Sequence, residues 1–267
     1  MKGFDFHRPQ SVADAVALLQ INLQGNDTAK LLGGGQSLLP VMKLDLAQPS
    51  DLVTLSAIPT LREIRDGNPL VIGALATHDE VATSPVVRRA IPGLAGLASG
   101  IGDAQVRNRG TIGGSVAHAD PSADYPAAVL ALNATIETDR RQIAADDFFL
   151  GFFTTALAPD EIITAVHFPV PERSAYAKFA SPASKYALVG VMVAKTAGGV
   201  RVAVTGAATQ AFRVPALEAA LSADFSPGAV APGSVAPGDL RSDVEASAEY
   251  RAHLITVMAR RAVEACQ

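Results

Sequence analysis

The chain has 267 residues, of which 49% are hydrophobic and 18% charged, and its formal net charge is −4. A chain of this size builds one large domain or two smaller ones around a core that needs no staples. The acidic balance argues against a phosphate backbone, and so against nucleic acid, as a partner. The single cysteine, Cys266, excludes internal disulfides, cysteine-based zinc sites and iron–sulfur clusters. Redox chemistry would therefore need an organic cofactor or another chain.

The N-terminal residues lack the apolar core of a signal peptide. No apolar run in the sequence is long enough to cross a bilayer as a helix. We therefore expect no transmembrane segment and a cytoplasmic protein, with association with the inner face of the membrane as the alternative location.

Short helices and strands alternate over the first part of the chain. Ser11 precedes apolar residues at helical spacing and is a predicted helix cap. In chain order we predict a helix from Val12, a polar turn at 25–27, a strand at 29–32, a helical turn at 38–42, strands at 51–55 and 69–75, a short helix capped by Thr77, helices at 85–97 and 126–132, and strands at 134–138 and 162–168. Residues 100–124, rich in glycine and aspartate, predict one long functional loop.

A proline-rich segment, 169–174, marks a predicted domain boundary. Beyond it, β-branched runs at 188–196 and 200–208 flank a Gly-Gly pair and predict a hairpin. We then predict a helix at 214–221, a Pro/Gly/Ala loop at 226–239 and a closing helix at 245–265. The pattern is that of an α+β protein, in which a mixed helix-and-strand region precedes a smaller sheet-plus-helix domain.

Two segments place adjacent glycines beside hydroxyl-bearing residues: Gly-Gly-Gly-Gln-Ser at 33–37 and Thr-Ile-Gly-Gly-Ser at 111–115. Glycine lets the backbone approach a ligand closely, so that successive N–H groups converge on an anion. Ser37, Thr111 and Ser115 would add hydroxyl donors. One interpretation is a pair of cradles for the two phosphates of a pyrophosphate; the other is a pair of tight turns. Neither segment carries a Rossmann or P-loop motif.

His118, Asp120 and Asp124 lie close together in the sequence. An imidazole and two carboxylates are metal-ligand types, but their spacing matches no metal motif. A loop that caps the next helix is the other interpretation, with Asp124 as the N-cap or as an acceptor for a ligand hydroxyl. The composition also allows a Ser-His-Asp triad, although no G-x-S-x-G nucleophile elbow is present.

Lys178 and Tyr186 lie early in the predicted second domain. The simpler interpretation makes both of them ordinary strand or surface residues. The alternative is that Tyr186 presents its ring to a planar ligand.

Three motifs occur in order: GGGQSLLPVMK at 33–43, IGDAQVRNRGTIGGS at 101–115 and AHADPSAD at 117–124. Together they resemble the FAD-binding medium subunit of bacterial molybdenum hydroxylases of the carbon-monoxide dehydrogenase type. This subunit is related to the FAD domain of xanthine dehydrogenase. The similarity covers essentially the whole chain.

The resemblance implies a two-part FAD-binding domain of the vanillyl-alcohol-oxidase type over residues 1–171, with subdomains at about 1–55 and 56–171. A smaller C-terminal domain would occupy 172–267. The two glycine segments would hold the FAD pyrophosphate, and Tyr186 would lie near the isoalloxazine ring. The cofactor contacts that the resemblance implies are Lys30, Leu31, Leu32, Gly33, Gly34, Gly35, Gln36, Ser37, Leu38, Ile101, Thr111, Ile112, Gly113, Gly114, Ser115, His118, Ala123, Asp124, Ile163, Lys178 and Tyr186.

Three positions depart from the family pattern. Gln36 stands where some members have His, and Ser115 where many have Asn or Asp. Lys185 precedes Tyr186 where an acidic residue often stands. The last departure changes the charge expected near the flavin, and such charges tune a flavin's reduction potential.

The resemblance also implies a division of labour between chains. Family members oxidise their substrate at a molybdopterin centre in a large subunit, and electrons pass through [2Fe–2S] clusters in a small subunit to FAD and then to an external acceptor. With one cysteine, this chain would supply only the FAD step, and we expect no general acid or base in it. The implied assembly is a dimer of heterotrimers.

Two other functions remain open from the sequence. One is a stand-alone FAD-dependent oxidoreductase of the same fold class, which would need its own substrate pocket and proton donor. The other is a non-enzymatic binding or metal-site protein built on His118, Asp120 and Asp124.

Overall fold

The computed structural model describes residues 2–25 and 28–266, so most of the polar turn predicted at 25–27 lies outside the described residues. The helices within the described part are α1 (Val12–Gln24), α2 (Leu38–Lys43), α3 (His78–Thr83), α4 (Pro85–Ala90), α5 (Pro92–Ser99), α6 (Ala104–Arg107), α7 (Ile112–His118), α8 (Tyr125–Ala131), α9 (Ala145–Phe148), α10 (Pro215–Ala223) and α11 (Ala248–Ala265). The strands are β1 (Asp5–His7), β2 (Ala29–Leu32), β3 (Asp51–Thr54), β4 (Ile64–Arg65), β5 (Leu70–Gly73), β6 (Thr135–Thr138), β7 (Gln142–Ala144), β8 (Phe149–Gly151), β9 (Thr154–Thr155), β10 (Ile163–Phe168), β11 (Arg173–Ala180), β12 (Ala187–Thr196), β13 (Gly199–Thr205) and β14 (Phe212–Arg213).

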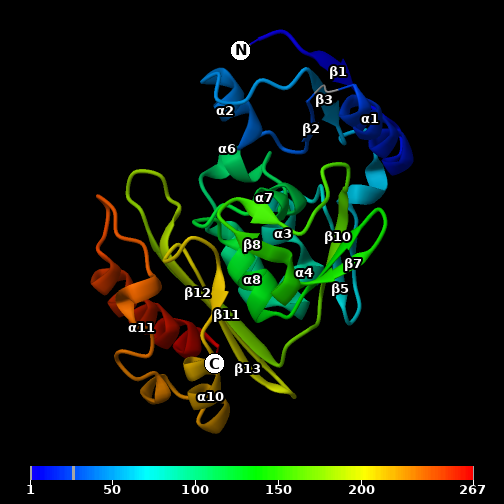
Figure 1. Cartoon of the computed structure of the whole chain (residues 1–267). Coiled ribbons are helices and arrows are strands. Elements are labelled where there is room, and N and C mark those ends of the chain that lie inside the picture. The colour runs from blue at the N-terminus through cyan, green and yellow to red at the C-terminus, as the bar shows by residue number, and fades with distance from the viewer. Residues whose placement is uncertain (1, 26–27, 267) are drawn as a thin grey trace.

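The N-terminal lobe is a small parallel sheet covered by α1 (Figure 1). Its strands run in the order β1-β3-β2, and both outer strands pair with β3 in parallel. Because β1 and β2 both run parallel to β3, the chain needs a crossover between them, which α1 supplies. Ser11 caps α1 by accepting a hydrogen bond from the Asp14 N–H, as predicted. Ala15 and Leu19 of this helix pack with Val53 of β3 in a separate apolar cluster.

The middle of the chain forms an antiparallel sheet in the order β4-β5-β10-β6-β7, and helices α3 to α8 pack beside it (Figure 1). One large apolar cluster joins this sheet to the helices, with Ile72, Leu94 and Val129 fully buried in it. Residues of the β2–α2 connection and of the second glycine segment both line the space between this region and the N-terminal lobe.

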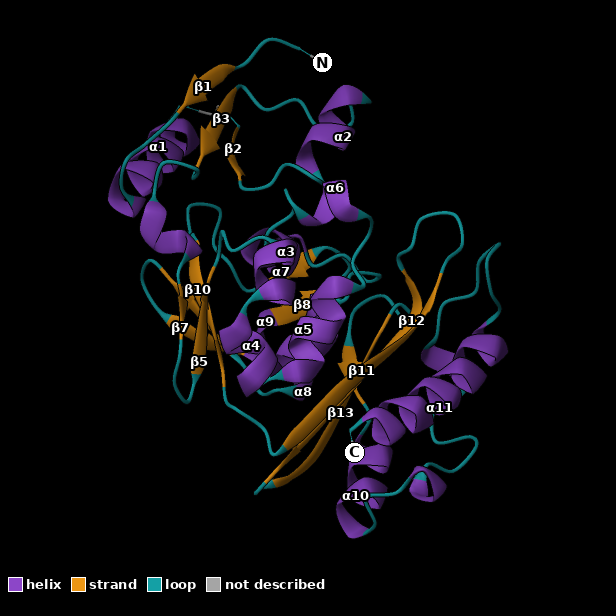
Figure 2. Ribbon diagram, turned by 180° about the vertical axis from the view of Figure 1, so that it is seen from behind, coloured by secondary structure: helices purple, strands orange, loops and turns teal. Residues whose placement is uncertain are grey.

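The C-terminal region is an antiparallel sheet in the order β11-β12-β13-β14 (Figure 2). Alternate residues of a strand point to opposite faces. In β12, Met192 and Ala194 join the large cluster of the middle region, whereas Val191 and Val193 join a second cluster with α10 and α11. The sheet is thus covered on both faces. The long apolar run of β12 in the sequence follows from its burial on both sides.

The predicted α+β fold class is confirmed, and the structure corrects two predicted elements. The helix predicted at 85–97 is two helices, α4 and α5, because Pro92 lacks an N–H and forces Ile91 out of helical geometry. The loop predicted at 100–124 contains α6 and α7, which begin at the caps Asp103 and Thr111. These two short helices were not predicted because the segment is rich in glycine, which disfavours helices. Both caps nevertheless follow the usual preference for Asp and Thr.

The strand β11 was not predicted, and it begins inside the segment taken as a domain boundary. We propose to keep the domain boundary between residues 171 and 172, because the sheet that begins with β11 lies beyond it. The two domains share part of their apolar core, since β12 packs against both the middle region and α11.

Among the described residues, no helix is long and apolar enough to cross a membrane.

Candidate cofactor-binding site

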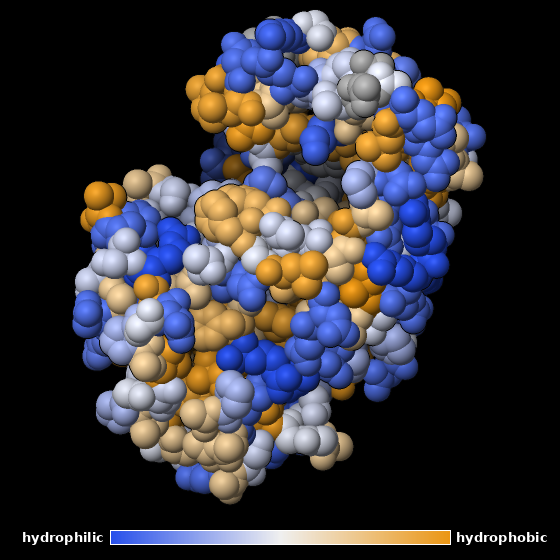
Figure 3. Space-filling view, in the orientation of Figure 1, coloured by the Kyte–Doolittle hydropathy of each residue, from blue (hydrophilic) through white to orange (hydrophobic). Residues whose placement is uncertain are grey.

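A cleft of about 720 Å³ lies between the N-terminal lobe and the rest of the molecule. The space-filling view is indented at this level, below the part that carries β1 to β3 (Figure 3). Residues of the β2–α2 connection, of α7, of the segment after β9 and of the loop before β12 line it. Its volume falls within the range of protein pockets that enclose small molecules and cofactors.

The first glycine segment presents a run of free donors to the cleft. None of the backbone N–H groups from Gly33 to Leu38 donates to an acceptor among the residues that the structure describes. These residues leave β2 and enter α2, and the first N–H groups of a helix have no partner within that helix. Ser37 makes no side-chain capping bond that would satisfy them. Convergent N–H groups of this kind suit a phosphate or other anion.

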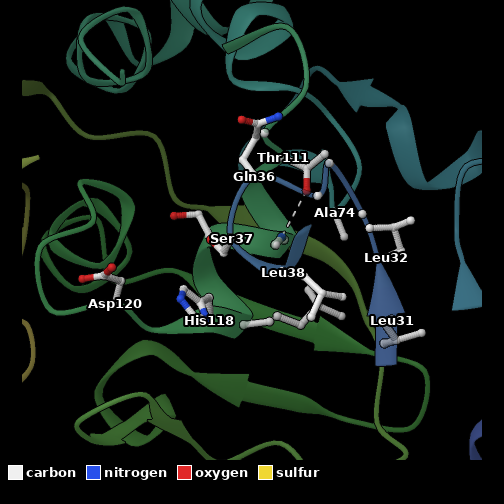
Figure 4. Close-up of a pocket in the computed structure, with 18 of the residues that line it drawn as sticks. Leu31, Leu32, Gln36, Ser37, Leu38, Ala74, Thr111, His118 and Asp120 are labelled. Carbon is white, nitrogen blue, oxygen red and sulfur yellow. Dashed lines mark hydrogen bonds between the residues drawn. The ribbon is translucent and has the colours of Figure 1, made fainter. Parts of the chain in front are cut away.

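The second glycine segment differs from the first. The N–H groups of Ile112 and Gly113 donate to the carbonyls of Ala76 and Ala74, at 3.0 and 2.8 Å. Gly114 and Ser115 donate to the side chain and carbonyl of Thr111, the N-cap of α7. The dashed line in Figure 4 marks the bond from Gly114 to Thr111. The two segments are therefore not equivalent: the first offers N–H groups, and the second offers hydroxyls on a helix face.

Figure 4 shows the cleft residues from both sides of the cleft. Leu31 and Leu32 belong to β2, and Gln36, Ser37 and Leu38 to the start of α2; His118 and Asp120 come from the end of α7 and just beyond it. Most of the residues expected at the cofactor line this one space. They are Lys30, Leu31, Leu32, Gly33, Gly34, Gly35, Gln36, Ser37, Leu38, Ile101, Thr111, Gly113, Gly114, Ser115, His118, Ala123, Asp124, Ile163 and Tyr186.

Ile112 and Lys178 do not line the cleft. Ile112 is fully buried in the large apolar cluster, so its side chain supports α7 from behind. Lys178 lies on β11 and its ammonium group is turned inward to the carboxylate of Asp124, at 3.0 Å. Both residues are thus behind the wall of the cleft.

The first glycine segment packs against the second one and against the two residues that precede it. A Cβ atom on this residue would lie 1.9 Å from the carbonyl oxygen of Arg109, and one on Gly33 would lie 3.1 Å from the hydroxyl of Thr111. The chain therefore needs glycine at position 34 for this close approach.

Gly34→Ala is expected to lower the free energy of unfolding by about 1–3 kcal/mol, because the backbone at 109–110 must move away from the new methyl group. Urea unfolding of the apo-protein measures this loss. Gly96→Ala is the matched control, since nothing lies within 4 Å of a Cβ there. Equal stability of the two variants would contradict the packing described for Gly34.

Asp124 is buried, with 4% of its side chain exposed. It stands at the N-cap position of α8, but its side chain makes no capping bond, so the predicted capping role is wrong. Its carboxylate instead accepts from the hydroxyl of Tyr176 at 2.5 Å and from Lys178. Burial raises the pKa of Asp124, while the charge of Lys178 and the two hydrogen bonds pull it down. The carboxylate is committed to this internal network.

His118 and Tyr186 both face the cleft. The His118 ring lies 4.9 Å from the ring of Phe153, centroid to centroid, and burial lowers the pKa of His118 more than Asp120 raises it. Tyr186 is 45% exposed, and burial together with the charges of Asp120 and Asp124 raises the pKa of its hydroxyl. Within the described ranges, no group of three or more His, Cys, Asp or Glu side chains comes together as a metal site. The ligand types at 118, 120 and 124 therefore do not converge.

Several residues that line the cleft were missed by the sequence analysis. The segment from Thr155 to Ile162 forms one wall, and no motif marks it. His78 also lines the cleft, with 5% of its surface exposed. It is the first residue of α3, and no motif in the sequence marked it.

A family model described as the FAD binding domain in molybdopterin dehydrogenase matches residues 2–171. The chain belongs to this family. It is 39% identical over 270 residues to the nicotine 6-hydroxylase medium subunit of Paenarthrobacter nicotinovorans, covering 96% of this chain and 94% of that one. It is 38% identical to the carbon monoxide dehydrogenase medium chain of Hydrogenophaga pseudoflava, covering 98% and 96% of the two chains.

A solved structure extends this similarity to the fold. A chain of carbon monoxide dehydrogenase from Hydrogenophaga pseudoflava, solved in a form that lacks the Mo-pyranopterin moiety of the molybdenum cofactor, superposes with a TM-score of 0.90. The identity is 39%, and the match covers 99% of this chain and 97% of that one. The resemblance inferred from the motifs is confirmed, as is the expected class of oxidoreductase subunit.

The cleft fits FAD, the cofactor of this family. The free N–H groups from Gly33 to Leu38 suit a pyrophosphate, and the hydroxyls of Thr111 and Ser115 lie in the same cleft. The apolar side chains of Leu31, Leu38 and Ile163 suit flat ring systems.

Proposed function

We propose that the chain is the electron-transfer subunit of a molybdenum hydroxylase complex. It would receive electrons from [2Fe–2S] clusters of a partner chain and pass them, through FAD bound in the cleft, to an external acceptor. The observation that carries the proposal is the run of N–H groups from Gly33 to Leu38, which have no acceptor among the described residues and face a cleft of cofactor size. The family match and the full-length relatives support the same conclusion.

The groups around the cleft suit binding rather than acid–base chemistry. Asp124 is held by Lys178 and Tyr176, and Glu161 accepts two hydrogen bonds from Arg141, which helps to hold the pKa of Glu161 at about 2. Both carboxylates are occupied within the chain. FAD would supply the one- and two-electron redox chemistry when bound. The residues that line the cleft, among them the partly exposed Tyr186, would hold and orient it.

The single cysteine separates this function from that of a complete oxidoreductase. Cys266 is buried, with 5% exposed, and burial raises the pKa of its thiol to about 11. A lone buried thiol cannot hold a cluster, so the iron–sulfur clusters of the proposed electron path would belong to another chain. We therefore propose a large molybdopterin-binding subunit and a small [2Fe–2S] subunit as partners, in a dimer of heterotrimers in the cytoplasm.

The purified chain is expected to bind FAD with about one cofactor per chain and to release it on denaturation. The measurement is the flavin absorbance of the folded protein, followed by identification of the released cofactor. A preparation that is colourless and does not bind added FAD would refute the proposal. Turnover of an organic substrate by the isolated chain would favour instead a stand-alone flavoenzyme of the same fold.

A further inference from the structure

Lys178 has no free donor for a ligand. An ammonium group has three N–H donors, and Nζ of Lys178 lies 2.8 Å from the carbonyl oxygen of Gly100, 3.0 Å from the nearer carboxylate oxygen of Asp124 and 3.2 Å from the carbonyl oxygen of Lys185. Only 11% of the side chain is exposed. The resemblance implied a contact with FAD at this residue, whereas its hydrogen bonds are already made within the chain.

The three acceptors lie on separate parts of the molecule. Gly100 follows α5, Asp124 precedes α8, and Lys185 lies in the 181–186 loop that joins β11 to β12. Asp124 is itself fixed, because the Tyr176 hydroxyl donates to it from two residues before Lys178 on the same strand. Lys178 thus ties the 181–186 loop to the wall of the cleft.

The bond to Lys185 acts directly on Tyr186. The carbonyl of Lys185 belongs to the peptide group that leads into Tyr186, and a peptide group is planar, so fixing that oxygen orients the bond to the next Cα. Lys185 has a φ of 61°, an unfavourable conformation for a residue other than glycine, and it persists only where the surroundings enforce it. Its N–H donates to Ser181 within the same loop.

We propose that Lys178 is a positioning residue of the FAD site, which through the carbonyl of Lys185 sets where the ring of Tyr186 faces the cleft. This inference rests on the proposed function, in which the ring of Tyr186 contacts FAD. Lys178 acts on the cofactor only through the loop. Its role is therefore separable from that of a direct ligand.

The first test uses the apo-protein and needs no cofactor. Lys185 is exposed, so trypsin cleavage after it reports how firmly the 181–186 loop is held. In Lys178→Met this cleavage is expected to accelerate about tenfold relative to cleavage after Lys43, which lies in another lobe. Lys195→Met is the matched control, because Lys195 is on the neighbouring strand and packs over Phe225. Unchanged cleavage after Lys185 would overturn the proposal.

Removal of the ammonium alone leaves Asp124 buried without its cation, which can prevent folding. The double variant Asp124→Asn/Lys178→Met removes both charges and still breaks the bond to Lys185. It is expected to show the same faster cleavage after Lys185, relative to Asp124→Asn alone. Equal acceleration at all tryptic sites would indicate general unfolding and would count against a specific hold on the loop.

The second test is a double-mutant cycle on the dissociation constant of FAD. Lys178→Met and Tyr186→Ala are each expected to weaken FAD binding about tenfold. The double variant is expected to bind FAD no more weakly than either single variant, since Lys178 acts through Tyr186. If the double variant instead loses the product of the two single losses in affinity, Lys178 is an independent ligand and the proposal is overturned. Absence of FAD binding in the unaltered protein would refute the proposed function, while the proteolysis would still decide the role of Lys178.

Discussion

Gly114→Leu is expected to weaken FAD binding by at least about 100-fold while the apo-protein stays folded. Gly114 lies on the exposed face of α7 and lines the cleft opposite the first glycine segment. A Cβ there meets only the hydroxyl of Thr111, at 2.9 Å, so the helix itself tolerates a side chain with a small shift of its cap. The leucine side chain would occupy the space in which the pyrophosphate is proposed to lie. Titration of the apo-protein with FAD, followed by flavin fluorescence, measures the effect.

Gly96→Leu is the control for this prediction. Gly96 is also a glycine within a helix, α5, but nothing lies within 4 Å of a Cβ there. Its substitution is expected to leave FAD binding unchanged and to stabilise the helix slightly, because leucine favours helices more than glycine does. FAD binding by Gly114→Leu within a few-fold of the unaltered protein would refute the proposed location of the pyrophosphate.

The sequence was sufficient where local signals and tertiary packing agree. Ser11 and Thr77 were recognised as caps because their hydroxyls and the apolar spacing after them are local features. The strand from Ile163 to Phe168 and the hairpin of β12 and β13 were evident from their β-branched runs. These elements lie in the interior, where burial and propensity favour the same conformation.

The cleft is lined largely by the connections between such elements, whose conformation is harder to predict from the sequence. The two glycine segments were found because glycine pairs beside hydroxyl-bearing residues can be recognised in the sequence. The sequence does not show that the two segments differ in their hydrogen bonding. Only the structure shows that Gly113 donates to Ala74 whereas the N–H groups after β2 have no acceptor among the described residues. Lys178 was assigned to the cofactor by resemblance. Its hydrogen bond to the distant residue Gly100 could not be predicted from the residue types alone.

The stability of the apo-protein is expected to fall by about 3 kcal/mol between pH 6.5 and about pH 4 through His78 alone. Burial, together with the positive charge of Arg107, lowers the pKa of this imidazole from 6.5 to about 4. Nδ1 of His78 is buried without a hydrogen-bond partner in the described part of the chain, and its ring packs 5.4 Å from that of Tyr125, between centroids. Both the burial and the charge of Arg107 disfavour the protonated form.

The sign follows from proton binding. Below pH 6.5 the unfolded chain takes up a proton at His78 that the folded chain does not bind until about pH 4, so protonation favours unfolding within this window. The stability is complete above pH 6.5. The lowered pKa of His118 acts in the same direction, and the raised pKa of Asp124 in the opposite one. Both contributions remain when His78 is replaced, so the difference between the unaltered protein and His78→Gln isolates this residue.

Urea unfolding of both proteins at several pH values tests this prediction. The free energy of unfolding of the unaltered protein is expected to decline more steeply with falling pH than that of His78→Gln. His253→Gln is the control, since His253 is exposed on α11 and its replacement is expected to keep the steep decline. Parallel curves for His78→Gln and the unaltered protein would contradict the prediction, because they would show that His78 has the same pKa in the folded and unfolded states. Below pH 6.5 the cleft would then carry an additional positive charge next to Gly110, where a Cβ atom would lie 2.5 Å from Nε2 of His78.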